Sequence, residues 1–197
     1  TVETTNFACQ RLSVILDSYT VYFDLVLCDS NGEIVANGRK GKYDSIGKNV
    51  ASSYWFRKAM ECTTGEDYAW ETVHKSQLVN DELVLVYTTA VRENGSNHGK
   101  ILGALGIIFQ YEELAQTIVE RISEVSEEGQ WTRACIVDDT GLVLADSDHK
   151  NLEETIVFEG RDDLFKESKG FVIGEFNQVD CCIAHARAPG YETYTTG

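Results

Sequence analysis

Aromatic side chains gather in one part of this sequence, between residues 54 and 87, and basic side chains accompany them. Rings with polar edges form flat apolar walls, which commonly bind a small organic molecule or a cation. The alternative is that the same rings form an ordinary hydrophobic core. The members of this aromatic cluster, which are the candidate ligand-binding residues, are Tyr54, Trp55, Phe56, Arg57, Tyr68, Trp70, His74, Lys75 and Tyr87.

The sequence offers no recognisable catalytic arrangement. A hydrolytic or transfer site needs a nucleophile with a neighbouring base, or paired carboxylates in a cleft. The four histidines lie in separate segments, and Gly38–Lys42 lacks the spacing and the following Ser or Thr of a phosphate-binding loop. We therefore expect neither enzymatic activity nor a cofactor.

A metal site is not expected either. The acidic residues between Asp138 and His149 do not have the spacing of a calcium-binding loop, and hairpin turns with a solvated acidic loop explain them better. Cys181 and Cys182 precede His185, but neighbouring residues of a strand point to opposite faces and cannot easily share a metal.

Charge excludes one class of partner. The chain has 17 basic and 32 acidic residues and a formal net charge of −15. Such a surface repels phosphate backbones, so nucleic acid is not an expected partner.

One stretch of sequence occurs twice. The segment Leu25–Asn37 is similar to the segment Ala134–Asp146. Each has an apolar run that ends in aspartate, a turn with Gly32 or Gly141, and a second apolar run, which together predict a β-hairpin. Two such hairpins indicate two similar modules in tandem.

Periodicity predicts the elements that position the aromatic cluster. Apolar residues at helical spacing predict helices over residues 4–18 and 111–125, and Ser52 or Ser53 is expected to cap a short helix that ends at Met60. Apolar runs and alternation predict the remaining strands, which span residues 68–73, 83–90, 101–109, 171–176 and 181–186.

These segments, in this order, resemble the double Cache (dCache) sensor domains of bacterial methyl-accepting chemotaxis proteins and related sensory receptors. The resemblance is carried by the hairpin Tyr22–Asn37, the phrase Ile46–Val50, the segment Tyr54–Met60 and the glycine-rich strand Gly103–Phe109. It implies an α+β fold of two PAS-like Cache modules in tandem along an N-terminal helix, each a mixed, largely antiparallel sheet flanked by helices.

The resemblance also implies a domain order. Residues 1–20 are expected to end the N-terminal helix, and residues 21–110 to form a first, distal module with the ligand pocket. Residues 111–130 would form a linking helix, and residues 131–197 a second, proximal module. The stretch Ala184–Tyr194 resembles the penultimate part of such a module, which normally continues into one more strand, so we expect the second module to be truncated at its C-terminus.

The resemblance extends to the ligand pocket. Cache domains that bind amino acids have an arginine two residues before a tryptophan-aromatic pair, a tyrosine on the next strand, and an aspartate in the glycine-rich strand. Trp55–Phe56 match the pair and Tyr68 matches the tyrosine. Ser53 stands at the arginine position, and Ile107 or Ile108 at the aspartate position. The groups that would pair with an α-carboxylate and an α-ammonium are therefore missing.

We consequently expect an organic acid, an amine or a heterocycle as the ligand, with Arg57, His74 and Lys75 as possible charged contacts. The expected function is non-catalytic small-molecule sensing in a bacterial signal-transduction receptor, first of all a chemoreceptor. Ligand binding in the first module would shift helices at a dimer interface, and the full receptor would be a homodimer. The resemblance places the domain in the periplasmic part of a membrane receptor.

Two alternatives remain open. The six cysteines are expected to be mostly buried free thiols, which favours a reducing compartment and a cytoplasmic redox or cofactor sensor. The other alternative is a dimerisation spacer that has lost ligand binding.

Overall fold

A computed structural model describes residues 2–124 and 131–188. The chain divides into two compact units, Thr1–Leu114 and Ala115–Gly197, which we call the first and the second unit. The end of the expected linking helix and the end of the stretch Ala184–Tyr194 lie outside the described residues.

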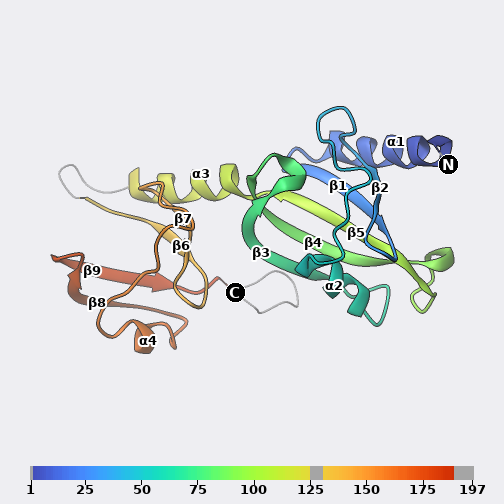
Figure 1. Cartoon of the computed structure of the whole chain (residues 1–197). Helices are drawn as coiled ribbons and strands as arrows, with labels where there is room; N and C mark the ends of the chain where they lie inside the picture. Colours follow the sequence, from blue (N-terminus) through green and yellow to red (C-terminus); the bar gives the residue numbers. More distant parts are fainter. Residues whose placement is uncertain (1, 125–130, 189–197) are drawn as a thin grey trace. The chain divides into compact units, whose positions relative to one another are not determined.

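The first unit is built on a five-stranded antiparallel sheet with the strand order β2-β1-β5-β4-β3 (Figure 1). The central strand β5 pairs with both β1 and β4, so the hairpins β1–β2 and β3–β4 meet on it. The strands are β1 (Tyr22–Asp29), β2 (Ile34–Asn37), β3 (Ala69–Ser76), β4 (Glu82–Arg92) and β5 (Ile101–Gln110).

Two helices cover opposite faces of this sheet (Figure 1). Helix α1 (Val2–Ser18) packs against β1 and β2, and helix α2 (Tyr54–Glu61) packs against β3, β4 and β5. Two short 3-10 helices, η1 (Gln77–Val79) and η2 (Glu93–Gly95), follow β3 and β4.

The core of the first unit lies between the sheet and α2. Residues on the α2 face of the strands, such as Val26, Val86 and Ile108, have at most 1% of their surface exposed. Burial of each such side chain stabilises the fold by about 1.5–3 kcal/mol. Trp55 and Phe56 of α2 belong to the same core.

The second unit contains two separate two-stranded sheets among its described residues. Helix α3 begins at the end of the first unit, and its buried Ala115 and Val119 belong to the second. The elements are α3 (Tyr111–Glu124), β6 (Cys135–Val137), β7 (Val143–Asp146), α4 (Arg161–Leu164), β8 (Lys169–Phe176) and β9 (Val179–Ala186).

The repeated segments fold into hairpins with the same register. Every pair of partners in β6–β7 has its counterpart in β1–β2 at a constant shift along the chain, and both hairpins have an irregularity at the same step. Asp29 Oδ1 accepts hydrogen bonds from the backbone N–H of Asn31 and Glu33, and Asp138 Oδ1 accepts two equivalent bonds. The side chain of the turn aspartate therefore fixes each hairpin locally.

Strand β6 is much shorter than its counterpart β1. Residues Tyr22–Leu25 of β1 pair with β5, whereas the pairing of β1 with β2 begins only at Val26. The equivalent residues of the second unit, 131–134, lie outside any strand, and residues 131–188 contain no strand equivalent to β5. The missing neighbour explains the short strand.

The expected α+β class with a largely antiparallel sheet is confirmed, and the predicted helices and strands lie within a few residues of the observed ones. The second unit differs from the expected sheet in having two hairpins. None of the helices in the described part of the chain is long and apolar enough to cross a membrane.

Candidate functional site

Trp55 and Phe56 project from α2 onto the sheet. They are 3% and 5% exposed, and their rings meet edge to face with centroids 6.1 Å apart. A Cβ at Gly106 of β5 would lie 3.1 Å from two carbons of the Trp55 ring. A glycine at this position leaves room for the indole. None of the four main cavities of the described residues is lined by either ring.

Helix α2 is tied to β3 by a residue that the sequence analysis missed. Ser53 occupies the N-cap position as expected, but its side chain makes no capping hydrogen bond. Instead, the backbone N–H of Trp55 donates to Glu71 Oε2 at 3.1 Å. Negative charge is favourable at the start of a helix. The two residues are sixteen positions apart, and the alternating pattern of β3 was the only signal that pointed Glu71 toward α2.

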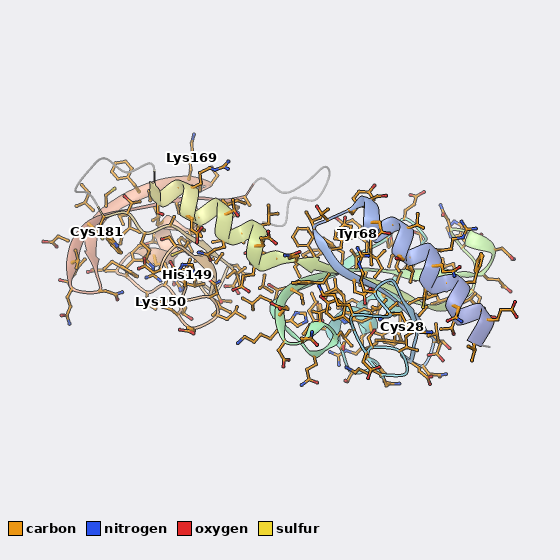
Figure 2. All side chains as sticks on the ribbon, turned by 90° about the horizontal axis from the view of Figure 1, so that it is seen from above. Cys28, Tyr68, His149, Lys150, Lys169 and Cys181 are labelled. Carbon is orange, nitrogen blue, oxygen red and sulfur yellow. The ribbon has the colours of Figure 1, made fainter. Side chains whose placement is uncertain are left out.

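The other aromatic residues of the cluster meet on strands β3 and β4. Trp70 and Tyr87 are cross-strand partners, and Tyr68 contacts Tyr87 edge to face with ring centroids 6.3 Å apart. Trp70 is 39% exposed and Tyr87 is 40% exposed. These three side chains form a half-exposed patch, and Figure 2 labels Tyr68 in it.

Strand register places the two groups of rings on opposite faces of the sheet. The pair after Trp70 and Tyr87 is Glu71 and Val86, and Glu71 contacts α2. Because successive side chains of a strand alternate between faces, Trp70 and Tyr87 point away from α2. The structure therefore places Trp55 against Phe56 on one face of the sheet and the three residues of the patch on the other face. The predicted aromatic cluster is thus two separate groups.

The polar members of the aromatic cluster lie mostly at the surface. Tyr54, Arg57 and Lys75 are exposed. His74 is half-buried, and its Nδ1 lies 2.8 Å from the carbonyl oxygen of Thr72. A carbonyl oxygen only accepts, so this contact assigns the hydrogen to Nδ1 and leaves Nε2 for another partner.

The two positions that distinguish amino-acid-binding Cache domains are uncharged in the folded unit. Ser53 is half-buried at the start of α2. Ile108 is 1% exposed and lies on the same face of the sheet as Gly106, beneath Trp55. Neither side chain could neutralise an α-carboxylate or an α-ammonium.

All six cysteines are free, as predicted, but the expectation that most of them are buried is wrong. Only Cys9 and Cys28 are buried, because the other four lie at the end of α2 or on the two-stranded sheets of the second unit. Burial raises the pKa of both Cys28 and Cys135 to about 12. Since the thiolate is the reactive form, these two thiols are poor redox sensors. Figure 2 labels Cys28 in the first unit and Cys181 in the second. Cys181 is half-buried and Cys182 exposed, as expected for neighbours on a strand.

A cavity of about 520 Å³ lies in the second unit. Its walls come from the segment Arg133–Val137 on one side and from Asp180–Ala184 of β9 on the other. The cavity thus separates β6 from β9. In the first unit the corresponding strands, β1 and β4, are separated by β5.

Arg133, at the edge of this cavity, holds a buried ion cluster. Its Nη2 and Nε donate to the two carboxylate oxygens of Asp146 at 2.6 and 3.0 Å, and Nη2 also donates to Glu154 at 2.8 Å. The side chain of Arg133 is 6% exposed and that of Asp146 is fully buried. The guanidinium is therefore already neutralised, and the cluster is a structural feature of the second unit.

Solved structures with the same fold are sensor domains. The sensor domain of the V. cholerae histidine kinase DctB has a TM-score of 0.61 and 14% identity, and the match covers 84% of this chain and 57% of that one. The ligand-binding domain of the Campylobacter jejuni chemoreceptor Tlp3, solved with 4-methylisoleucine, has a TM-score of 0.64 and 17% identity, with 89% and 64% covered. An extracellular ligand-binding receptor from Desulfohalobium retbaense has a TM-score of 0.64 and 13% identity, with 87% and 29% covered.

This chain spans less than two thirds of the length of each of these structures. No protein-family model matches the sequence. No curated protein matches it either. At these identities the likeness concerns the fold. The chain has the fold of the sensor domains of chemoreceptors and histidine kinases, which agrees with the Cache-type resemblance of its sequence.

Proposed function

We propose that this chain is a non-catalytic sensing domain that binds a small molecule in a bacterial signal-transduction receptor, most simply a chemoreceptor. The observation that carries this proposal is the sheet β2-β1-β5-β4-β3 with α2 holding Trp55 and Phe56 against its glycine-containing central strand. The shared fold with ligand-binding sensor domains supports it.

The ligand is proposed to bind between α2 and the sheet. Trp55 and Phe56 fill this space, so the ligand must displace at least one ring and move α2 outward. Helix α2 is short, and the cap from Glu71 joins its first turn to β3. A ligand that binds the open arrangement more tightly shifts the population of α2 positions, which is the proposed signal.

The ligand class is proposed to be an organic acid, an amine or a heterocycle. Tlp3 has been solved with amino acids such as L-norvaline and L-valine. In this chain, the uncharged Ser53 and the buried Ile108 would leave both charges of an amino acid without partners. An unpaired buried charge costs about 3–5 kcal/mol. An amino acid would carry this cost twice, whereas an organic acid or an amine carries it once and a neutral heterocycle not at all.

A thermal-shift screen followed by calorimetric titration tests this proposal. At a hundred times its dissociation constant, a ligand stabilises the folded state by about 2.7 kcal/mol. Micromolar binding of several common amino acids would contradict the proposed ligand class.

Tryptophan fluorescence can locate the ligand. A variant with Trp70→Phe and Trp131→Phe retains Trp55 as its only tryptophan, and a variant with Trp55→Phe and Trp131→Phe retains Trp70. We expect ligand binding to change the emission of the variant that retains Trp55. A change confined to the variant that retains Trp70 would move the site to the half-exposed patch.

A dimerisation spacer is the second candidate, and two observations favour it. Trp55 and Phe56 already fill the space under α2 as a packed core does. The exposed Phe7 and Val14 of α1 also fit pairing with a second copy. A concentration-dependent dimer by sedimentation, together with no stabilising ligand in a broad screen, would favour the spacer over the sensor.

Residues 131–197 of the second unit are proposed to form a second Cache module. Its support is the common register of the two hairpins, the short β6, and the cavity where the first unit has β5. A further strand from outside the described residues would fill this place. Hydrogen exchange tests the proposal, because the outward amides of β9 should exchange quickly in residues 1–197 and slowly once a further strand is added. Equal rates would contradict it.

We also propose that this domain lies in the periplasm as part of a membrane receptor. It rests on the fold, since one of the similar structures is an extracellular ligand-binding receptor. The cytoplasmic redox alternative is disfavoured by the raised pKa values of Cys28 and Cys135. Fusion of the full receptor gene to a periplasm-dependent reporter enzyme would decide between the two compartments.

A further inference from the structure

Asp24 is a fully buried carboxyl group with one satisfied and one unsatisfied oxygen. Its Oδ1 accepts hydrogen bonds from the backbone N–H groups of Leu25, Gly38 and Arg39 at 2.8, 2.9 and 3.0 Å. Its Oδ2 is buried and has no hydrogen-bond partner in the described residues. A buried oxygen in this state is costly, and native proteins rarely keep one.

Asn37 presents a second unsatisfied acceptor. This residue is also fully buried, and its Nδ2 donates to the carbonyl oxygen of Tyr43 at 3.0 Å and to Ser45 Oγ at 2.7 Å. These two bonds assign the amide orientation, and they leave Oδ1 buried without a partner in the described residues. Two acceptors cannot satisfy each other unless one carries a hydrogen.

The strand register puts the two side chains next to each other. Asn37 pairs with Val26, and Asp24 lies two residues before Val26 and hence on the same face of β1. Gly38, the residue after Asn37, donates its N–H to Asp24. The two unsatisfied oxygens therefore belong to neighbouring side chains at one end of the β1–β2 hairpin.

The repeat supplies independent support for this contact. At the constant shift between the two hairpins, Asp24 corresponds to Arg133 and Asn37 corresponds to Asp146. In the second unit these two positions are joined directly, with Arg133 Nη2 2.6 Å from Asp146 Oδ2. The side chains at these two positions therefore point toward each other in the second unit, where the longer arginine spans the gap, and in the first unit the same two positions hold two unsatisfied acceptors and no free donor.

We propose that Asp24 carries a proton on Oδ2 and that this O–H group donates a hydrogen bond to Oδ1 of Asn37, so that the folded first unit contains a built-in proton site. The proton comes from solvent and returns to solvent, and no other group needs to change its state. With the proton present, both orphaned oxygens are satisfied.

The electrostatic surroundings agree with a carboxyl that holds its proton. Burial raises the pKa of Asp24 to about 6, against the opposing effect of the three backbone N–H groups and of Arg39. The guanidinium of Arg39 is engaged with Asp17 of α1 at 2.7 Å. From β5, the residue paired with Asp24 is the uncharged Ile108.

The site makes the β1–β2 hairpin sensitive to pH. Because the pKa of Asp24 in the folded state is above its ordinary value of 3.8, its contribution to stability is fully present below that value and is lost as the pH rises through about 6. Above this pH, a carboxylate oxygen faces the amide oxygen of Asn37. At this higher pH, we expect the hydrogen bonds from the backbone N–H groups of Gly38 and Arg39 to Asp24 of β1 to loosen.

Two measurements test the proposal. The first is an NMR titration of the aspartate carboxyl carbons in chain labelled with ¹³C-aspartate, in which the D24N variant identifies the Asp24 signal. We expect this signal to change at a higher pH than the signals of the exposed aspartates. D24N itself retains Oδ1 for the backbone donors and offers an N–H to Asn37. The second measurement is the protection factor of the β1 and β2 amides, which is the intrinsic exchange rate at each pH divided by the observed rate. We expect it to fall by about tenfold between pH 5 and pH 7.5 in the unmodified chain and to stay constant in D24N.

Asp17→Asn is the matched control, because it removes a nearby carboxylate that is exposed and paired with Arg39. In this variant, hydrogen exchange of β1 and β2 should depend on pH as it does in the unmodified chain. An Asp24 signal that titrates at or below the ordinary aspartate value would overturn the proposal, and so would a D24N variant with the pH dependence of D17N. Should D24N not fold, the titration is assigned through correlations to the backbone amides of Asp24 and Leu25 and decides alone.

Discussion

Replacing Arg133 by methionine should destabilise the second unit and leave the first unit intact. The Arg133 side chain is 6% exposed, and its partner Asp146 is fully buried. The methionine fills most of the volume but leaves Asp146 without its cation. Removing one partner of a buried ion pair costs about 3–5 kcal/mol, which is a large part of the stability of a small domain.

The penalty should depend on pH in a defined direction. Burial raises the pKa of Asp146, but the hydrogen bonds from Arg133 and from the backbone N–H of Asp148 outweigh it and hold this pKa below its usual value. The ion pair therefore stabilises the unmodified chain above about pH 4, and this contribution is lost as the pH falls. In R133M, Asp146 can escape the penalty by taking up a proton, so the difference between the two proteins should shrink toward pH 4.

The assay is urea unfolding followed by tryptophan emission in a variant that retains only Trp131, which belongs to the second unit. Lys166→Met is the control, because the pair Lys166–Asp163 is nearly as short, at 2.7 Å against 2.6 Å for the buried pair, but lies at the surface. We expect no measurable effect from K166M. A loss below about 1 kcal/mol in R133M, the value typical of exposed pairs, would refute the reasoning.

Three further predictions concern the first unit. Gly106→Ala should cost about 1–3 kcal/mol in urea unfolding, because the new Cβ would press on the ring of Trp55; unchanged stability would contradict that packing. Glu71→Ala should cost about 1 kcal/mol in the same assay and Glu71→Gln less, because glutamine keeps an oxygen that can cap α2. No loss in Glu71→Ala would mean that the cap contributes nothing. Cys28 should react with iodoacetamide far more slowly than Cys182, because burial raises the pKa of Cys28 to about 12. Peptide mass spectrometry measures both rates, and equal rates would show that strand β1 opens readily.

The amino-acid sequence by itself determined the local elements of this protein. The hairpins follow from the turn residues, because Asp29 and Asp138 bond backbone groups only a few positions away. The free state of the cysteines and the Cache-type order of the segments could also be predicted from the sequence. The hairpins depend on contacts within short stretches of chain, so composition and periodicity are enough to indicate them.

The tertiary structure decided which side chains meet. The register of β3 against β4 sends Trp70 to one face of the sheet while α2 holds Trp55 on the other, although the sequence presents both as one aromatic cluster. The cap from Glu71 and the neighbouring Asp24 and Asn37 likewise depend on pairing between distant segments. Such contacts are selected by burial and strand register over the whole unit, since a shift of one residue exchanges the two faces of a strand.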